Sequence, residues 1–279
     1  MPISSEQATQ DRDQHTPDFA TITARQQETW SEGDFHQIAR LNVVMAEALC
    51  EAADLRGGER VLDVACGSGT AALVAARRYC DVTGLDYVES LIERARSRAR
   101  AEAMDVDFVV GDAQELPFPD ASFDAVLSVY GVQFAPNQER AARELLRVCK
   151  PGGRIALASP PPFGWSGDFF AVNAKYVPPP AGLASPLRWG TAEGLRSLLG
   201  ADIASLDIQE RPAYQYFRSI DHAVDVFLTH FGPAIKASAA SEDGHYRNHI
   251  EDVFRRYDRG DDASAVIENT YLLSVAERA

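Results

Sequence analysis

A glycine-rich turn beside a carboxylate offers the clearest chemistry in this 279-residue sequence. The segment VLDVACGSGT, residues 61–70, predicts a short apolar strand, a sharp turn at residues 67–69 and the start of a helix. Small residues let a ligand approach the backbone closely, and free amides at a helix start can hold an anionic group. Asp63 adds a carboxylate to the same turn. The turn is therefore a candidate binding site for part of a small ligand.

Two further aspartates follow the next two predicted strands. Asp86 comes 86 − 67 = 19 residues after Gly67, where a doubly wound fold places a carboxylate against ribose hydroxyls. Asp112 follows the third strand and is placed to accept a hydrogen bond from an exocyclic amine. Taken singly, Asp86 is also a candidate helix cap and Asp112 an ordinary loop residue. Residues 67–72 also fit the GxGxxA form of the dinucleotide fingerprint, so a nicotinamide cofactor stays open.

Alternating strands and helices must position these loops. Apolar runs predict strands at 60–64, 82–85, 106–110, 123–130 and 154–158, and helical periodicity predicts helices at 71–78, 88–100 and 138–148. Strands separated by helices imply right-handed crossovers, and hence a parallel sheet with helices on both faces. The aspartates then lie at the carboxyl ends of neighbouring strands.

The regions that flank this core have different patterns. Residues 1–20 are polar and predict a disordered tail, and residues 21–56 are mostly helical, with one apolar stripe through Ile38, Met45 and Leu49. Proline runs at 160–162 and 178–180 bracket an aromatic-rich stretch that cannot continue the sheet, which predicts a cap over a pocket. We expect one domain over residues 21–279: a helical lid at 21–56, a core at 57–159, and substrate-covering segments with the final strands at 160–279.

The composition excludes several partners. The net charge is 27 − 41 = −14, whereas binding to nucleic acid or to anionic membranes needs clustered Lys and Arg. No apolar run is long enough to span a membrane, and the first residues lack a secretory signal. The four cysteines show no CxxC pairing and no zinc-ligand spacing, so we expect free thiols, no metal and a cytoplasmic location. A homodimer stays open.

Five motifs in a fixed order resemble a known family. They are VLDVACGSG at 61–69, Asp86, GDA at 111–113, LPFPDASFD at 116–124 and LRVCKPGG at 146–153. The series resembles the class I S-adenosylmethionine-dependent methyltransferases, and most of all the small-molecule branch related to ubiquinone and menaquinone biosynthesis. The resemblance covers about residues 25–160. It implies an α/β, Rossmann-like sheet of seven strands, mostly parallel with a reversed last strand, under an N-terminal helical lid and a cap insertion.

The resemblance also implies a cofactor, S-adenosylmethionine, and residues that bind it. Asp86 would bind the ribose, and the neighbouring Tyr87 would lie near the adenine. We expect Trp30 in the lid to close over the cofactor, and Gln133 to contact either ligand. The remaining implied positions are Asp63, Gly67, Ser68 and Gly69 at the methionine part, Asp112 and Ala113 at the adenine amine, and Ser128 and Val129 beside the cofactor.

Catalytic residues are harder to predict. Methyl transfer from a sulfonium needs a general base only if the acceptor must lose a proton. His36, His230 and Tyr130 are our candidates for an acid, a base or an orienting group, although a structural role is common for each. Cys66 adds a thiol to the glycine turn that is a candidate for reactivity. We also hypothesise that the aromatic Phe163 and Trp165 line a pocket for the acceptor.

The function that follows is methyl transfer to a small, fairly apolar acceptor, through O, N or C, in specialised or isoprenoid-like metabolism. One alternative is a protein, such as a cyclase, that binds S-adenosylmethionine without transferring its methyl group. A second alternative is an NAD(P)-dependent oxidoreductase, which only the GxGxxA match supports. The sequence lacks the Asn-Pro-Pro-aromatic tetrapeptide of amino-directed DNA methyltransferases, in keeping with its acidity.

Overall fold

A seven-stranded sheet forms the centre of the computed structural model, which describes residues 17–261 and 263–279. The strand order is β3-β2-β1-β4-β5-β7-β6, and β7 alone runs antiparallel to both of its neighbours. This is the predicted Rossmann-like α/β fold with a reversed last strand. The strands are β1 (Arg60–Val64), β2 (Asp81–Asp86), β3 (Asp107–Val110), β4 (Phe123–Val129), β5 (Cys149–Ser159), β6 (Ile203–Phe217) and β7 (Ala265–Arg278).

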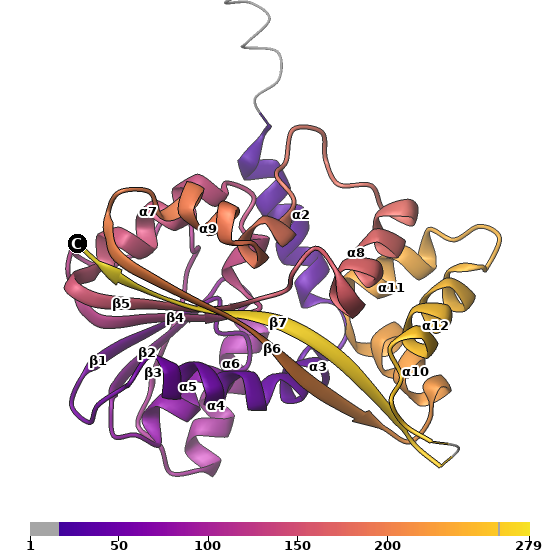
Figure 1. Cartoon of the computed structure of the whole chain (residues 1–279), viewed down its shortest axis with the longest axis horizontal. Helices are drawn as coiled ribbons and strands as arrows, with labels where there is room; N and C mark the ends of the chain where they lie inside the picture. Colours follow the sequence, from indigo (N-terminus) through magenta and orange to yellow (C-terminus); the bar gives the residue numbers. More distant parts are fainter. Residues whose placement is uncertain (1–16, 262) are drawn as a thin grey trace, which may run out of the picture.

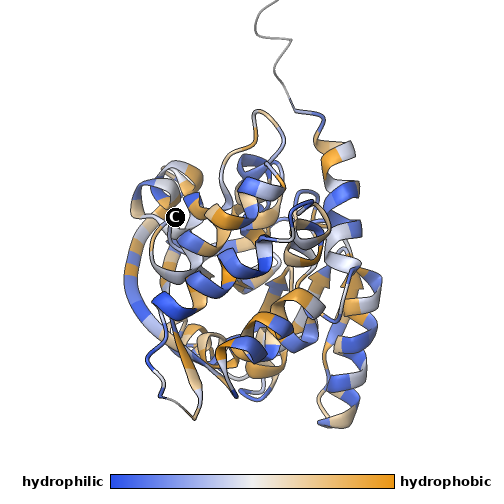
Figure 2. Ribbon diagram, turned by 90° about the vertical axis from the view of Figure 1, so that its right-hand side faces the viewer, coloured by the Kyte–Doolittle hydropathy of each residue, from blue (hydrophilic) through white to orange (hydrophobic). Residues whose placement is uncertain are grey.

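Helices cover both faces of the sheet (Figure 1). One apolar core joins α4, α5 and α6 to one face, and a second core joins α7 and α9 to the other. Figure 2 shows hydrophilic and hydrophobic residues on different sides of these helices, as two-faced packing requires. The helices are α2 (Phe19–Ser31), α3 (His36–Ala39), η1 (Arg40–Asn42), α4 (Val43–Ala52), α5 (Thr70–Ala76), α6 (Glu89–Ala101), η2 (Val132–Phe134), α7 (Gln138–Val148), α8 (Gly164–Tyr176), η3 (Pro186–Gly190), α9 (Ala192–Leu199), α10 (Ile220–His230), α11 (Gly232–Ala239) and α12 (Tyr246–Arg256).

A third apolar core lies beyond the sheet's carboxyl edge. It joins α8, α10, α11 and α12 to the far ends of β6 and β7, which extend past the shorter strands (Figure 1). Trp165 is at its centre, with its ring centroid 4.8 Å from that of Phe169 and 5.4 Å from those of Phe227 and Phe254. This aromatic packing gives the covering helices a core of their own.

The N-terminal segment differs from its prediction in two ways. The helix begins at Phe19, because the side chain of Asp18 accepts a hydrogen bond from the backbone of Thr21 at 3.1 Å and caps it. The predicted tail therefore ends earlier than residue 20, and its residues 1–16 lie outside the described part of the chain. The segment that is predicted to be mostly helical is also divided, because its first helix ends at Ser31. Gly33 has φ +70°, and a Cβ there would lie 2.9 Å from Ile235 and from the Thr229 carbonyl oxygen.

Two findings concern the proline-bearing segments. The stretch between the two proline runs, which we expect to form a cap, is helical over most of its length, in α8. The segment 150–153, which the composition predicts as a turn, is part of β5 and produces a register shift against β4. Among the described residues, no helix is both long and apolar enough to cross a membrane.

Candidate functional site

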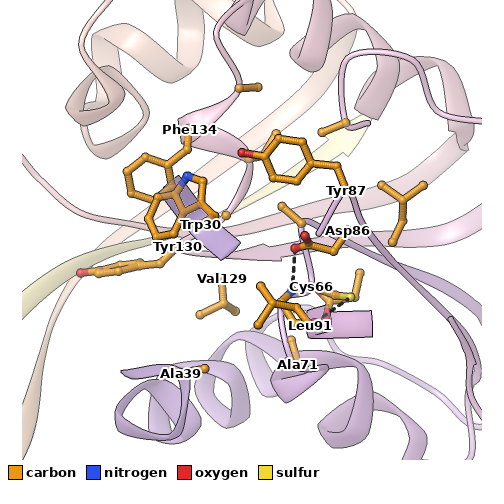
Figure 3. Close-up of a pocket in the computed structure, with 18 of the residues that line it drawn as sticks. Trp30, Ala39, Cys66, Ala71, Asp86, Tyr87, Leu91, Val129, Tyr130 and Phe134 are labelled. Carbon is orange, nitrogen blue, oxygen red and sulfur yellow. Dashed lines mark hydrogen bonds between the residues drawn. The ribbon is translucent and has the colours of Figure 1, made fainter. Parts of the chain in front are cut away.

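A pocket opens where the carboxyl ends of β1, β2, β3 and β4 meet under the lid (Figure 3). Parallel pairing aligns these ends, with Val64 opposite Leu85 and Asp86 opposite Val110. This is the edge at which doubly wound sheets bind their ligands. Nine of the predicted site residues line the pocket: Trp30, Asp63, Gly67, Asp86, Tyr87, Asp112, Ala113, Val129 and Tyr130.

Asp86 lies at the end of β2 and is almost fully buried. One carboxylate oxygen accepts a hydrogen bond from the backbone amide of Gly67 and the other from that of Val88, both at 2.9 Å. Burial raises the pKa of Asp86 to about 6, against the opposing effect of these amides. The side chain thus ties the glycine turn to the start of α6 and presents a fixed carboxylate to the pocket (Figure 3).

Asp63 places a second buried carboxylate beside the glycine turn. Its Oδ2 accepts a hydrogen bond from the amide of Ala72 at 2.8 Å, which holds the start of α5 against β1. Burial raises the pKa of Asp63 to about 7, and the nearby charge of Asp86 raises it further in the same direction. The same burial and carboxylates raise the pKa of the Cys66 thiol well above its usual value. This favours the neutral thiol of Cys66 over the more reactive thiolate.

Asp112 follows β3 and is half-buried at the wall of the pocket. Its carboxylate accepts hydrogen bonds from Gln114, at 2.8 Å from the backbone amide and 3.0 Å from Nε2. Gln114 Nε2 also donates to Thr23 Oγ1 in α2 at 3.0 Å, and Gln114 Oε1 accepts from the Asn137 amide at 2.9 Å. Gln114 therefore connects Asp112 to the lid and to the start of α7.

The lid contacts the loops that follow two other strands. Gln27 Nε2 donates a hydrogen bond to the backbone oxygen of Tyr87, the residue after β2, at 2.5 Å. His36 Nδ1 lies 3.0 Å from Ser68 Oγ in the glycine turn. Burial lowers the pKa of His36, and the positive charges of Arg98 and Arg94 lower it further, which favours a neutral ring. Together with Gln114, these contacts fix α2 and α3 over the pocket.

We call the part of the pocket that contains Asp63, Asp86 and Asp112 the polar end, and the part that contains Trp30, Phe35, Tyr130 and Phe134 the aromatic end. The Trp30 ring lies 4.7 Å from that of Phe134 and 5.4 Å from that of Phe35, measured between centroids. Figure 3 shows Trp30, Phe134 and Tyr130 together on the side opposite Asp86. No Lys, Arg or His is among the described residues that line the pocket. The aromatic end is thus uncharged.

Four residues predicted to contact the cofactor lie behind the wall of the pocket. Ser68 is buried against His36, and its carbonyl accepts from Arg98 at 2.6 Å. A Cβ at Gly69 would lie 2.9 Å from Phe108, so this glycine permits close packing. Ser128 Oγ donates to the Val64 carbonyl at 2.8 Å and accepts from the Val132 amide at 2.9 Å. Gln133 is 1% exposed and is not among the lining residues.

The three catalytic candidates are not brought together. Tyr130 lines the pocket, whereas His36 is directed to Ser68 and His230 ends α10, and neither histidine is among the lining residues. Burial raises the pKa of Tyr130, which favours the protonated phenol. The hypothesis for Phe163 and Trp165 is wrong, because Phe163 is 47% exposed and Trp165 is buried in the third core, and neither lines the pocket. The described residues contain no cluster of His, Cys, Asp or Glu that could hold a metal ion.

The pocket also includes residues that sequence reasoning did not select. Gly131 could have been selected from the sequence, because it directly follows Tyr130, a candidate that comes after β4. A Cβ on Gly131 would lie 2.6 Å from the Ala65 carbonyl oxygen. Ala65 and Tyr130 themselves have φ of +53° and +49°, a region that side chains disfavour. Cys66, a candidate from the sequence, lines the pocket as well. The other unselected lining residues are Phe35, Ala39, Asn42, Ala65, Thr70, Ala71, Leu85, Leu91, Gly111, Gln114, Val132, Phe134, Ala135 and Pro136.

Comparisons with known proteins agree with this geometry. The sequence profile of a methyltransferase domain matches residues 62–157. An uncharacterised protein of Mycobacterium bovis is 36% identical over 213 residues, which cover 75% of this chain and 77% of that protein. Demethylmenaquinone methyltransferase of Listeria monocytogenes is 34% identical over 187 residues, which cover 63% of this chain and 78% of that enzyme.

Among solved structures, the [4+2]-cyclase SpnF is 25% identical with a TM-score of 0.56, over 85% of this chain and 81% of that one. The profile and the Listeria relative both describe methyltransferases, and the sheet order and pocket fit that activity. The chain therefore belongs to the S-adenosylmethionine-dependent methyltransferase family, with S-adenosylmethionine as its cofactor.

Proposed function

We propose that this protein transfers a methyl group to a small, uncharged and largely apolar acceptor, through an oxygen, nitrogen or carbon atom. The observation that supports this most is the division of the pocket into a polar end with three carboxylates and an aromatic end without charge. A cationic cofactor suits the first end, and an apolar molecule suits the second. Such an acceptor fits specialised or isoprenoid-like metabolism.

The polar end fits S-adenosylmethionine in the chemistry of its donor set. Burial disfavours the ionised forms of Asp63 and Asp86, so a positive charge nearby would compensate both carboxylates. We assign Asp86 to the ribose hydroxyls, because a carboxylate oxygen that already accepts one backbone amide retains a second lone pair. We assign Asp63 and Gly67 to the methionine part, and Asp112 with Ala113 to the adenine amine. Tyr87 and Trp30 would flank the cofactor, and Val129 would lie beneath it.

The aromatic end argues against a phosphorylated or carboxylate-bearing acceptor. An anion that is taken out of water needs a cationic partner or a set of free backbone amides, such as the glycine turn offers at the polar end. At the aromatic end, the lining residues in the described part of the chain include no Lys or Arg and no cluster that could hold a metal ion. Planar or aliphatic molecules, by contrast, gain free energy from contact with Trp30 and Phe134. We therefore propose a neutral acceptor.

The cofactor supplies an activated methyl group on a sulfonium, and the protein must hold the acceptor in line with it. Trp30 and Phe134 exclude water from the aromatic end. Tyr130 is the one lining residue there that has a hydroxyl, and its raised pKa makes it a hydrogen-bond donor rather than a base. His36 and His230 lie outside the lining, so we propose catalysis by positioning, without a strong protein base.

A second function is kept because one observation favours it. The similarity to a [4+2]-cyclase relates this chain to a protein with a different reaction type. A cyclase or other binding protein that uses S-adenosylmethionine without methyl transfer would need the same polar end. The nicotinamide alternative has support only from the GxGxxA pattern, and the family assignment replaces it.

Calorimetry and a transfer assay test the proposal. We expect the purified protein to bind S-adenosylmethionine and S-adenosylhomocysteine, and not NAD(P)H. The protein is then incubated with methyl-labelled S-adenosylmethionine and a small-molecule cell extract, and the labelled product is identified by mass spectrometry. A neutral labelled product supports the proposal. A phosphorylated product would contradict the acceptor class, and binding without any labelled product would favour the cyclase alternative.

A further inference from the structure

A buried polar group lies beside the aromatic end of the pocket. Tyr130 lines the pocket with its ring, and its hydroxyl points away from the side on which Asp86 lies (Figure 3). Burial raises the pKa of this hydroxyl, and two polar neighbours, Ser166 of α8 and Asn269 of β7, lower it. Ser166 Oγ donates a hydrogen bond to Asn269 Oδ1 at 2.9 Å, and both residues are at most 1% exposed. Three elements that are distant in sequence thus bring polar side chains to one place.

Asn269 places a polar amide on a face of β7 that is otherwise apolar. Residues of β7 alternate between faces, and Ile267, Tyr271 and Leu273, which share the face of Asn269, belong to the apolar cores. An amide in such surroundings costs free energy unless its donor and acceptor are both satisfied. Only the Oδ1 atom has a partner. Asn269 Nδ2 and the Tyr130 hydroxyl have no hydrogen-bond partner among residues 17–261 and 263–279.

A second tyrosine–asparagine pair in the same protein shows what a purely structural pair looks like. Tyr246 donates a hydrogen bond from its hydroxyl to Asn173 Oδ1 at 2.9 Å, and Asn173 Nδ2 donates to the Phe169 carbonyl at 2.8 Å. Neither residue lines the pocket. Tyr246 and Asn173 thus have partners for the phenol and for both ends of the amide. Tyr130 and Asn269, beside the pocket, each keep one hydrogen-bond donor without a partner in the described part of the chain.

The backbone at Tyr130 gives an independent indication. Its φ of +49° lies in the left-handed region, which a bulky side chain adopts at a cost. The Tyr130 amide donates to the Ala158 carbonyl at 2.9 Å, and the next residue, Gly131, packs on Ala65 without room for a Cβ. The chain therefore holds Tyr130 in a strained conformation at the pocket wall. Strain of this kind is concentrated at functional sites.

We propose that Tyr130 and Asn269 bind an oxygen atom of the methyl acceptor, and that Ser166 orients the Asn269 amide for this purpose. The inference rests on the proposed function and narrows its substrate class to neutral, largely apolar molecules with a hydroxyl or carbonyl oxygen. Two donors lack a partner among the described residues: the phenol, which stays protonated, and Asn269 Nδ2, which is the free end of the amide once Oδ1 accepts from Ser166. The hydroxyl is buried here, so the acceptor must shift the Tyr130 ring to reach it.

A pair of probes that differ by one oxygen tests this subsite. Binding of 2-naphthol and of naphthalene is measured by equilibrium dialysis with protein saturated with S-adenosylhomocysteine. We expect 2-naphthol to bind at least about tenfold more tightly, as one completed buried hydrogen bond allows. Tyr130→Phe and Asn269→Leu should each reduce this preference to about twofold or less, and the double variant should lose nothing more, since both donors hold the same oxygen.

Tyr246→Phe is the matched control, since it removes a buried hydroxyl from the complete pair and should leave the preference unchanged. Melting curves of all variants identify any that fail to fold, and the wild-type preference tests the proposal without a variant. Equal binding of the two probes to the wild type would overturn it, as would a full preference in folded Tyr130→Phe protein. If the wild type prefers 2-naphthol but the labelling assay finds no methyl transfer, the proposed function is wrong and the oxygen-binding subsite still stands.

Discussion

The polar end and the aromatic end of the pocket differ in how their residues are distributed along the chain. The carboxylates of the polar end come from Asp63, Asp86 and Asp112, each in or directly after one of three successive strands of a parallel sheet. The aromatic end joins Trp30 of α2 to Phe134 of η2, and it packs on Phe231, which follows α10. Local motifs therefore specify the first end, and packing between distant helices specifies the second. Five predictions test this difference, from the largest expected effect to the smallest.

Trp165→Ala should cause the largest loss, and the loss should be in stability. The ring is 5% exposed and packs against Phe169, Phe227 and Phe254 in the third core. Removing it leaves a cavity that costs about 3–5 kcal/mol in the free energy of unfolding. Denaturant unfolding measures this change. A stable variant with weakened acceptor binding would restore the earlier hypothesis that Trp165 lines the pocket.

Asp86→Ala should act on the polar end alone. It leaves the amides of Gly67 and Val88 without their acceptor and removes the carboxylate we assign to the ribose. We expect cofactor binding to weaken by about 1–3 kcal/mol, roughly five- to 150-fold in Kd. Calorimetry with S-adenosylhomocysteine measures it, and Asp107→Ala, an exposed aspartate at the start of β3, is the control. An unchanged Kd would refute the ribose assignment.

Trp30→Ala should act mainly on the aromatic end. Its ring contacts Phe35, Phe134 and Phe231, and aromatic pairs of this kind contribute about 0.5–1.5 kcal/mol each. We expect the Kd of 2-naphthol to rise about tenfold and the Kd of S-adenosylhomocysteine to change about threefold or less. Dialysis and calorimetry give the two constants. A larger change for the cofactor than for naphthol would mean that Trp30 belongs to the polar end.

The two buried carboxylates should make cofactor stabilisation depend on pH. Burial raises the pKa of Asp63 from 3.8 to about 7 and that of Asp86 from 3.8 to about 6. At a pH between the unfolded and the folded pKa, the folded protein therefore binds more protons than the unfolded chain. Their contribution to stability therefore falls as the pH rises from about 4 to 7. A bound cation favours the ionised carboxylates and offsets this loss.

The increase in Tm produced by S-adenosylmethionine should accordingly grow between pH 5 and pH 8. Thermal melting with and without the cofactor measures it, and Asp63→Asn should flatten the dependence. S-adenosylhomocysteine, which lacks the sulfonium charge, should show a smaller increase. A rise in Tm that is the same at every pH would contradict the proposed electrostatic compensation.

Phe163→Ala should have the smallest effect. The side chain is 47% exposed, precedes α8 and is not among the lining residues. We expect a change within about 0.5 kcal/mol in the free energy of unfolding and unchanged binding of 2-naphthol. Denaturant unfolding and dialysis check both. A clear loss of naphthol binding would extend the aromatic end to the start of the cap.

Much of the fold could be predicted because its signals are local. The apolar strands and the helices between them repeat with clear periodicity, and the three carboxylates lie at fixed distances after short motifs. Where prediction was wrong, a contact from far along the chain was decisive. Gly33 interrupts the N-terminal helix because residues 229 and 235 pack against it. Trp165 is buried by helices up to ninety residues away, so its position between proline runs gave no indication of its surroundings.

The amino-acid sequence by itself determined the family, the sheet and the carboxylates of the polar end, because strand ends and helix starts bring neighbouring residues to one edge. Tertiary structure alone decided which residues line the pocket. Ser68, Gly69 and Ser128 match the motifs but support the wall from behind. Trp30 and Tyr130 could be selected from the sequence one by one, but their grouping with Phe134 in the aromatic end, and that of Tyr130 with Ser166 and Asn269, has no local signal, because these groups form only where elements distant in sequence pack together.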